Sequence, residues 1–277
     1  MSNAIHPFSN RETAFLKYEP IELNGLVYYP IRVADYSKWQ ALKPVLCLRQ
    51  GTLPAVFACM TYLQCVWALD STQQMNGYGG AWDALASIVA LSLRLSDTDM
   101  IQAIGNSDDY QTLSHMRIVK GDKKYDITPM EFNIVRNLIA EQNGAELPDE
   151  ADNPDLIEAA NDIANASTDT NLNCMIPDML TSVASAKNMR RADILEWSIK
   201  EFDDELRALR RRYGFFLSSI AESQGAKFTK GNPYPTWVFD RAKDEFAGLV
   251  SMEQLKSDHR ANFVQSDTPP ITNQEGE

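Results

Sequence analysis

The sequence predicts a mainly α-helical protein with a helical bundle-like core and two small β-hairpins. Apolar residues recur at helical spacing in several stretches, and two capping-box patterns mark helix starts. Two short strand patterns flank the turn dipeptides Asn24-Gly25 and Gly121-Asp122, which is typical of hairpins. With 277 residues, 44% of them hydrophobic and 23% charged, the chain can bury a core without disulfides or metals.

The N-terminal part is expected to place helices after the first hairpin, which covers residues 20–33. The first ten residues are polar and are expected to be loose. Asp35 can cap the helix that follows the hairpin, and Pro44 should kink or end that helix. The later helices expected here cover residues 54–69, 81–95 and 97–104.

The second hairpin is expected at residues 113–128, and a clear helix start follows it. Thr128 and Glu131 form a capping box, and Pro129 occupies the first helical position. The helix should end near Asn143-Gly144, because glycine is the common residue just after a helix.

A long acidic stretch separates this helix from the C-terminal part. No Lys or Arg occurs from 137 to 186, and residues 145–153 form an acidic connector. The polar segment 165–173 predicts a linker and is the best internal boundary. We therefore expect an N-terminal domain over 11–164, a C-terminal domain over 174–250, and disordered tails at 1–10 and 264–277.

The C-terminal part is expected to be the most helical. Pro177 should open a helix that reaches about residue 186. Asp193 and Glu196 form a second plausible capping box, which would start a long amphipathic helix. That helix can continue to Gly225 with Gly214 as a weak point, and a last helix is expected at 238–248.

The charge balance excludes nucleic acid as the main partner. The chain has 26 Lys and Arg against 38 Asp and Glu, a net charge of −12, whereas nucleic-acid binding needs a basic face. An acidic protein suits a basic or apolar partner. The uncharged stretch 53–69 is short for a membrane span and contains Thr61 and Gln64, so we expect a buried helix and no membrane partner.

No catalytic constellation, cofactor motif or metal site is predicted. The three histidines lie far apart in the sequence, without a paired-ligand spacing. The four cysteines form no CxxC pair and are expected to act mainly as small core residues. The acidic run 146–155 lacks the spacing of a calcium loop, and the glycines at 77–80 lack the ending of a phosphate-binding loop.

Three features are candidates for partner binding, each beside a simpler interpretation. The acidic run can dock a basic partner or be a solvated connector. The arginine cluster can contact an acidic surface or line a solvated helix face. Trp237 lies near lysines and other aromatic residues in the sequence. Such a turn can stack on the bases of single-stranded nucleic acid or pack against the helices. The candidate residues are Glu146, Asp149, Glu150, Asp152, Arg210, Arg211, Arg212 and Trp237.

Five segments form a pattern that keeps its order and spacing over about residues 26–240. They are the Tyr-Pro strand and Asp-Tyr helix start at 29–36, Met-Thr-Tyr-Leu at 60–63, the Glu-Gln-Asn and Leu-Pro-Asp stretch within 132–149, Trp-Ser-Ile within 195–206, and the Ser–Gly–Lys–Phe–Lys string within 213–237. Together these segments resemble a family of bacteriophage proteins encoded by phages of Gram-positive hosts. The resemblance departs at 165–174, where the family has a more basic stretch.

The resemblance implies a tail-morphogenesis protein without catalytic residues or a cofactor. The leading hypothesis is a chaperone for the tape-measure protein in the host cytoplasm. Its candidate surfaces are the acidic strip 146–155 and the exposed faces of the helix from Ile194 to Glu222. The alternative is a structural component of the virion tail or baseplate, and a phage-encoded enzyme is a third hypothesis with little support. The expected partners are phage tail proteins, and a homo-oligomer is compatible with each hypothesis.

Overall fold

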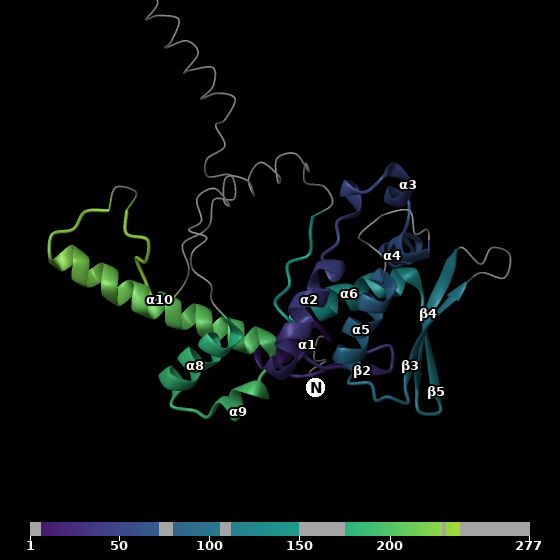
Figure 1. The fold of residues 1–277 in the computed structure, drawn as a ribbon, viewed down its shortest axis with the longest axis horizontal. Helices are drawn as coiled ribbons and strands as arrows, with labels where there is room; N and C mark the ends of the chain where they lie inside the picture. The colour runs from purple at the N-terminus through teal and green to yellow at the C-terminus, as the bar shows by residue number, and fades with distance from the viewer. Residues whose placement is uncertain (1–6, 72–79, 106–111, 150–174, 229–230, 239–277) are drawn as a thin grey trace, which may run out of the picture. The chain divides into compact units, whose positions relative to one another are not determined.

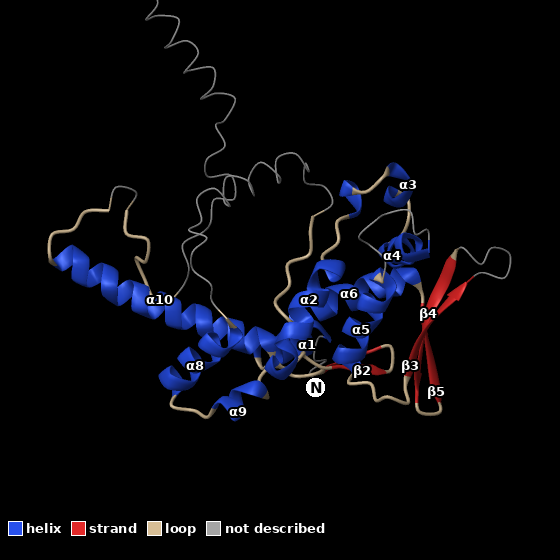
Figure 2. Ribbon diagram, viewed as in Figure 1, coloured by secondary structure: helices blue, strands red, loops and turns tan. Residues whose placement is uncertain are grey.

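The computed structural model describes residues 7–71, 80–105, 112–149, 175–228 and 231–238 (Figure 1). This part of the chain is mainly α-helical with two small antiparallel sheets, which confirms the predicted class (Figure 2). That the helices form a bundle stays a prediction. The helices are α1 Pro7–Leu16, α2 Tyr36–Leu46, α3 Ala55–Ala58, α4 Tyr62–Ser71, α5 Ala81–Leu93, α6 Pro129–Gln142, α8 Ile176–Lys187, α9 Arg191–Leu195 and α10 Ile199–Ser223.

Both predicted hairpins are confirmed. Strand β1, Ile21–Leu23, pairs antiparallel with β2, Leu26–Tyr28, and Asn24 and Gly25 adopt positive φ angles of 53° and 75° in the turn. In the second sheet, β4, Leu113–Lys120, pairs antiparallel with β5, Lys123–Ile127.

A third strand joins the second sheet where we expected a helix at 97–104. Strand β3, Met100–Gly105, pairs with β4, so that prediction was wrong. Ile101 and Ala103, two residues apart, pack against the core, as a strand places them on one face. Pairing with β4 supplies the hydrogen bonds of the strand, which a sequence window does not reveal.

Two further helix predictions need correction. The helix expected over 54–69 is broken, because Thr61 begins α4: its backbone N–H and its hydroxyl both donate to Oε1 of Gln64, at 3.2 and 2.8 Å. The long C-terminal helix does not start at Asp193, which lies inside α9. It starts after Ser198, whose hydroxyl oxygen accepts a hydrogen bond from the N–H of Glu201 at 3.1 Å.

The disordered tail predicted at 1–10 overlaps a helix. Residues 7–10 belong to α1, so the prediction is wrong for those residues. Phe15 packs against the core, and the hydroxyl of Tyr18, just after the helix, donates to Asp204 of α10 at 3.1 Å. These contacts with residues distant in sequence hold α1 against the core, although the sequence of α1 alone indicates a helix only weakly. Residues 1–6, the predicted tail at 264–277, and nearly all of the helix predicted at 238–248 lie outside the described residues.

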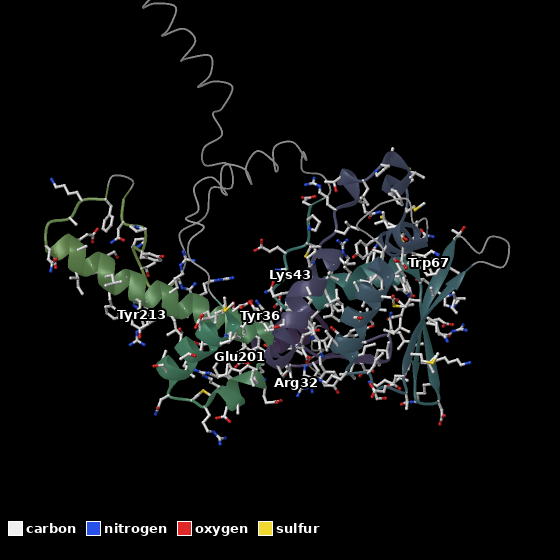
Figure 3. The ribbon with its side chains drawn as sticks, in the orientation of Figure 1. Arg32, Tyr36, Lys43, Trp67, Glu201 and Tyr213 are labelled. Carbon is white, nitrogen blue, oxygen red and sulfur yellow. The ribbon has the colours of Figure 1, made fainter. Side chains whose placement is uncertain are left out.

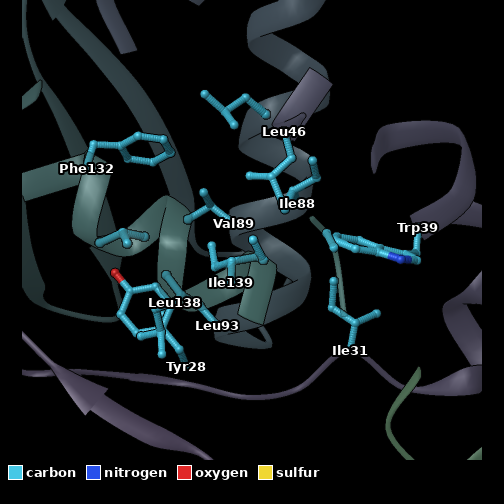
Figure 4. Close-up of a cluster of buried hydrophobic side chains, with 14 of the residues drawn as sticks. Tyr28, Ile31, Trp39, Leu46, Ile88, Val89, Leu93, Phe132, Leu138 and Ile139 are labelled. Atoms are coloured by element: carbon cyan, nitrogen blue, oxygen red, sulfur yellow. The ribbon is translucent and has the colours of Figure 1, made fainter. Parts of the chain in front are cut away.

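One large hydrophobic core joins residues from both sides of the predicted boundary (Figure 4). Side chains of α2, α5 and α6 meet in it, among them Trp39, Ile88 and Ile139 (Figure 4). Ile199 and Phe202 of α10 are fully buried in the same cluster. The division into domains 11–164 and 174–250 stays a prediction, and its boundary at 165–173 lies outside the described residues.

The extended segment 28–33 connects the parts of this core through its backbone. The N–H of Tyr29 donates to the carbonyl of Ser92 at the end of α5 (2.7 Å). The N–H of Ile31 donates to Oδ1 of Asn143 after α6 (2.8 Å), and its carbonyl accepts from the N–H of Ile199 at the start of α10 (2.9 Å). Three helices are therefore fixed to one short segment.

The apolar stretch that raised the question of a membrane is divided between α3 and α4. Among the described residues, no helix has both the length and the apolar character needed to cross a bilayer.

Replacing Asn143 by alanine should destabilise the fold by about 2 kcal/mol, because the buried N–H of Ile31 would lose its acceptor. Asn143 is 1% exposed, so water cannot readily take the place of its amide. Asn137→Ala removes an exposed asparagine from α6, the helix that Asn143 follows, and should change stability by less than about 0.5 kcal/mol. Urea denaturation of both variants measures the difference, and equal stabilities would contradict this role of Asn143.

Candidate functional site

Helix α10 carries one apolar stripe along its whole length. Seven apolar residues are separated alternately by three and four positions, which is the spacing of a coiled-coil heptad and places them on one side of the helix. They are Ile199, Phe202, Leu206, Leu209, Tyr213, Phe216 and Ile220. We call residues 199–209 the inner half of α10 and residues 210–223 the outer half.

The inner half uses this stripe to join the core. Ile199 and Phe202 are fully buried, and Leu206 and Leu209 pack against the same cluster. The ring of Phe202 meets that of Tyr36 edge to face, with centroids 6.1 Å apart. The helix α10 packs against α8, which in turn contacts α9 (Figure 1).

The outer half leaves the stripe uncovered. Tyr213, Phe216 and Ile220 of the stripe are 59%, 50% and 54% exposed, and the adjacent Leu217 is 68% exposed. Figure 3 labels Tyr213 on this half and Glu201 on the inner half. Large apolar side chains that gather on one helix face without cover are typical of a protein-binding surface. We call these four residues the outer stripe.

The charges of α10 change sign between the two halves. The inner half is acidic, and its ion pairs include Lys187 with Glu205 (2.6 Å) and Lys200 with Asp204 (3.6 Å). The predicted arginine cluster opens the outer half, where the side chains of Arg210 and Arg212 are exposed. The guanidinium of Arg212 lies over the ring of Phe216, 6.0 Å from its centroid.

Residues 231–238, which form the turn that contains Trp237, fold back onto the outer half through Tyr234. The ring of Tyr234 lies against Gly214, where an added Cβ would be 2.7 Å from the ring. Nε of Arg210 donates to the Tyr234 hydroxyl at 3.4 Å. Trp237 itself is 57% exposed, next to exposed Val238. The structure thus links the turn that contains Trp237 to Arg210 of the cluster.

The predicted acidic run is described only in part. Glu146 and Asp149 are exposed and follow α6, whereas Glu150 and Asp152 lie outside the described residues. Glu146 lies near Cys47 at the end of α2. Burial raises the pKa of the Cys47 thiol, and the nearby Glu146 carboxylate raises it further, while Lys43 and Arg136 oppose the shift.

Helix packing changes the pKa values of two acidic side chains in the inner half. Burial raises the pKa of Asp203, although Lys43 and a hydrogen bond with Tyr36 act against the shift. Burial also raises the pKa of Glu201, and Lys187 of α8 partly compensates. Figure 3 shows Tyr36, Lys43 and Glu201 around this part of the helix. The two carboxyls therefore have different neighbours, and helix packing explains why the pKa of each is raised.

A groove of about 650 Å³ lies between α2, α5 and residues 30–35. Its walls are mostly aliphatic, and neither Glu201 nor Asp203 lines it. The cationic side chains at its rim have partners: Arg32 with Glu196 (2.9 Å), Lys38 with Asp35 (3.1 Å), and Arg94 over the ring of Tyr29 (4.3 Å). The groove suits apolar side chains better than a small charged substrate.

Metal ligands are not grouped in the described part of the chain, where no three His, Cys, Asp or Glu residues could hold one ion. His115 on β4 lies 3.5 Å from Asp126 on β5. The Arg117 side chain donates to both oxygens of Asp126, at 2.6 and 2.8 Å, and lowers the pKa of that carboxyl. Of the cysteines, Cys65 is buried as expected, whereas Cys59 is exposed.

The sequence names the exposed faces of the helix from Ile194 to Glu222 as a candidate partner surface, but it does not single out the outer stripe within that helix. Its residues were expected to belong to an amphipathic helix, and periodicity alone does not show which turns of such a helix are covered. The contact of Tyr234 with Gly214 was also unforeseen. Its one sequence signal is a glycine in the middle of a helix, which often marks a close approach of another group.

Comparisons with protein-family models, curated proteins and solved structures found no match to this chain. The resemblance to phage tail proteins therefore stays a hypothesis.

Asp203→Asn should stabilise the protein by up to about 1 kcal/mol at pH 7. Folding raises the pKa of Asp203 above its unfolded value of about 4. Because the folded protein then disfavours the charged carboxylate, stability falls as pH rises from the unfolded pKa through the folded one. Near pH 3 the carboxyl is protonated in both states, and the gain should disappear. Denaturant unfolding at both pH values measures this, with exposed Asp97→Asn as the control, expected within about 0.5 kcal/mol. A loss of stability at pH 7 would contradict the prediction.

Gly214→Ala should release residues 231–238 from α10, because the new methyl group would collide with the ring of Tyr234. The helix itself should strengthen by about 0.5–1 kcal/mol, since alanine is the better helix former. Limited proteolysis should cut this segment several times faster than in the parent protein, as an order-of-magnitude expectation. Ser219→Ala, at a half-buried site of the same helix, is the control. An unchanged cleavage rate would show that Tyr234 does not depend on Gly214.

Proposed function

We propose that this chain is a non-enzymatic bacteriophage tail-assembly protein that acts as a chaperone for the tape-measure protein. The observation that carries the proposal is the outer stripe of α10, because four neighbouring large apolar side chains on one helix face suit the binding of another protein. The sequence resemblance described above supplies the phage context. The partner surface is the outer stripe together with the arginine cluster.

Physical considerations support a chaperone. A tape-measure chain exposes long apolar helix faces before the tail tube forms around it, and a helix with its own exposed stripe can cover them. The net charge of −12 keeps such complexes apart in solution. On this proposal the protein works in the host cytoplasm, without a cofactor, nucleic acid or membrane as partner.

The distribution of acidic groups favours this proposal over an enzyme that uses a pair of carboxyls. Two carboxyls that act as acid and base lie in one cleft, and their surroundings separate their pKa values. Here Asp203 lies by Tyr36 and Lys43, and Glu201 is influenced by Lys187. A structural component of the tail or baseplate is the remaining alternative, and it would require permanent interfaces.

The first experiment quantifies this chain in salt-washed virions and in infected lysate by mass spectrometry, for a phage that encodes it. A chaperone should be abundant in the lysate and absent from mature particles. A fixed copy number relative to the tail tube protein would overturn the chaperone proposal and favour the virion component.

A variant pair connects the function to the surface. Phe216→Glu with Ile220→Glu places charge on the outer stripe and should reduce co-purification of the tape-measure protein at least about tenfold. Ile134→Glu changes an apolar residue that is 49% exposed on α6 and should leave co-purification unchanged. Equal recovery with both variants would remove the outer stripe from the proposal.

A further inference from the structure

We propose that the outer half of α10 pairs with an acidic amphipathic helix of its partner to form a short two-stranded coiled coil. This inference rests on the proposed function and names the chemistry of the partner at the same surface. The partner helix would carry apolar residues at heptad spacing, with Asp or Glu beside them.

The heptad spacing of α10 does not stop where the core ends. In the usual notation, Leu206, Tyr213 and Ile220 occupy a positions, and Leu209 and Phe216 occupy d positions. The core of the protein covers the first part of this seam, and the outer stripe continues it in the same register. A second helix with the same spacing can therefore bury the remainder.

Two of the positions beside the seam carry arginines. Arg210 occupies an e position and Arg212 a g position, and these positions flank the apolar seam of a coiled coil and pair with charges of the other helix. Both side chains are exposed. The contacts of Arg210 with Tyr234 and of Arg212 with Phe216 leave them on the outer half, where a carboxylate of a neighbouring helix can reach them.

The local charge distinguishes an acidic partner from a second copy. The outer half, 210–223, holds three arginines and one acidic residue, Glu222, so its local charge is +2. Two copies of this segment would bring like charges together, and a basic helix would also be repelled. An acidic helix is the occupant whose charge complements this surface.

Two synthetic 28-residue peptides test the proposal with the full chain. Both have Leu at a and d positions, and they carry Glu or Lys at e and g. Isothermal titration should show that the Glu peptide binds at least about tenfold more tightly than the Lys peptide. The chain as a whole has a charge of −12, so non-specific attraction would favour the Lys peptide instead.

Charge reversal makes the test specific. Arg210→Glu with Arg212→Glu should invert the preference, so that the Lys peptide binds more tightly. Lys123→Glu with Lys124→Glu makes the same change in net charge on the exposed part of β5 and should preserve the preference for the Glu peptide. Circular dichroism checks that each variant is folded.

Three results would overturn the inference: a preference of the parent protein for the Lys peptide, binding of neither peptide, or a dimer in sedimentation that Phe216→Glu dissociates. The last result would identify a second copy as the occupant. If the inference fails but the outer-stripe variant still loses the tape-measure protein, the proposed function stands without the coiled coil. If the Glu peptide binds but the chain is a fixed part of the virion, the inference stands and the chaperone proposal fails.

Discussion

The buried segment 28–33 is the constraint on which the arrangement of the helices depends. Tyr28, Ile31 and Val33 fill the core, so the backbone between them is removed from water and its polar groups need partners. Those partners come from the end of α5, from two side chains after and within α6, and from the residues that begin α10. Apolar side chains and backbone hydrogen bonds of one short segment thus hold together helices that are distant in sequence.

The position of α10 follows from this attachment. The N–H of Ile199 donates to the carbonyl of Ile31, and the N–H of Val33 donates to the carbonyl of Trp197. These bonds fix the first turn of the helix on the core. Because a single helix of 25 residues is longer than the surface that covers it, the same apolar face is buried at one end and exposed at the other.

The separation of charge along α10 agrees with this division. Acidic groups lie on the inner half, where Lys187 and Lys200 pair with them and burial raises the pKa of Asp203 and Glu201. Arginines lie on the outer half, beside the exposed apolar residues. One helix therefore serves both as a structural element and as a candidate binding surface, and we propose that tail assembly uses the latter.

Local signals in the sequence determined the elements whose stabilising groups are close together: the hairpin at Asn24-Gly25, the capping box at Thr128, and the heptad spacing of α10. Tertiary structure decided the features that depend on residues distant in sequence. Strand β3 forms because β4 pairs with it, α1 is held by the core and by Asp204, and the outer stripe is exposed because the core ends at Leu209. A periodic pattern shows which face of a helix is apolar, but only the folded chain decides which turns of that face are covered.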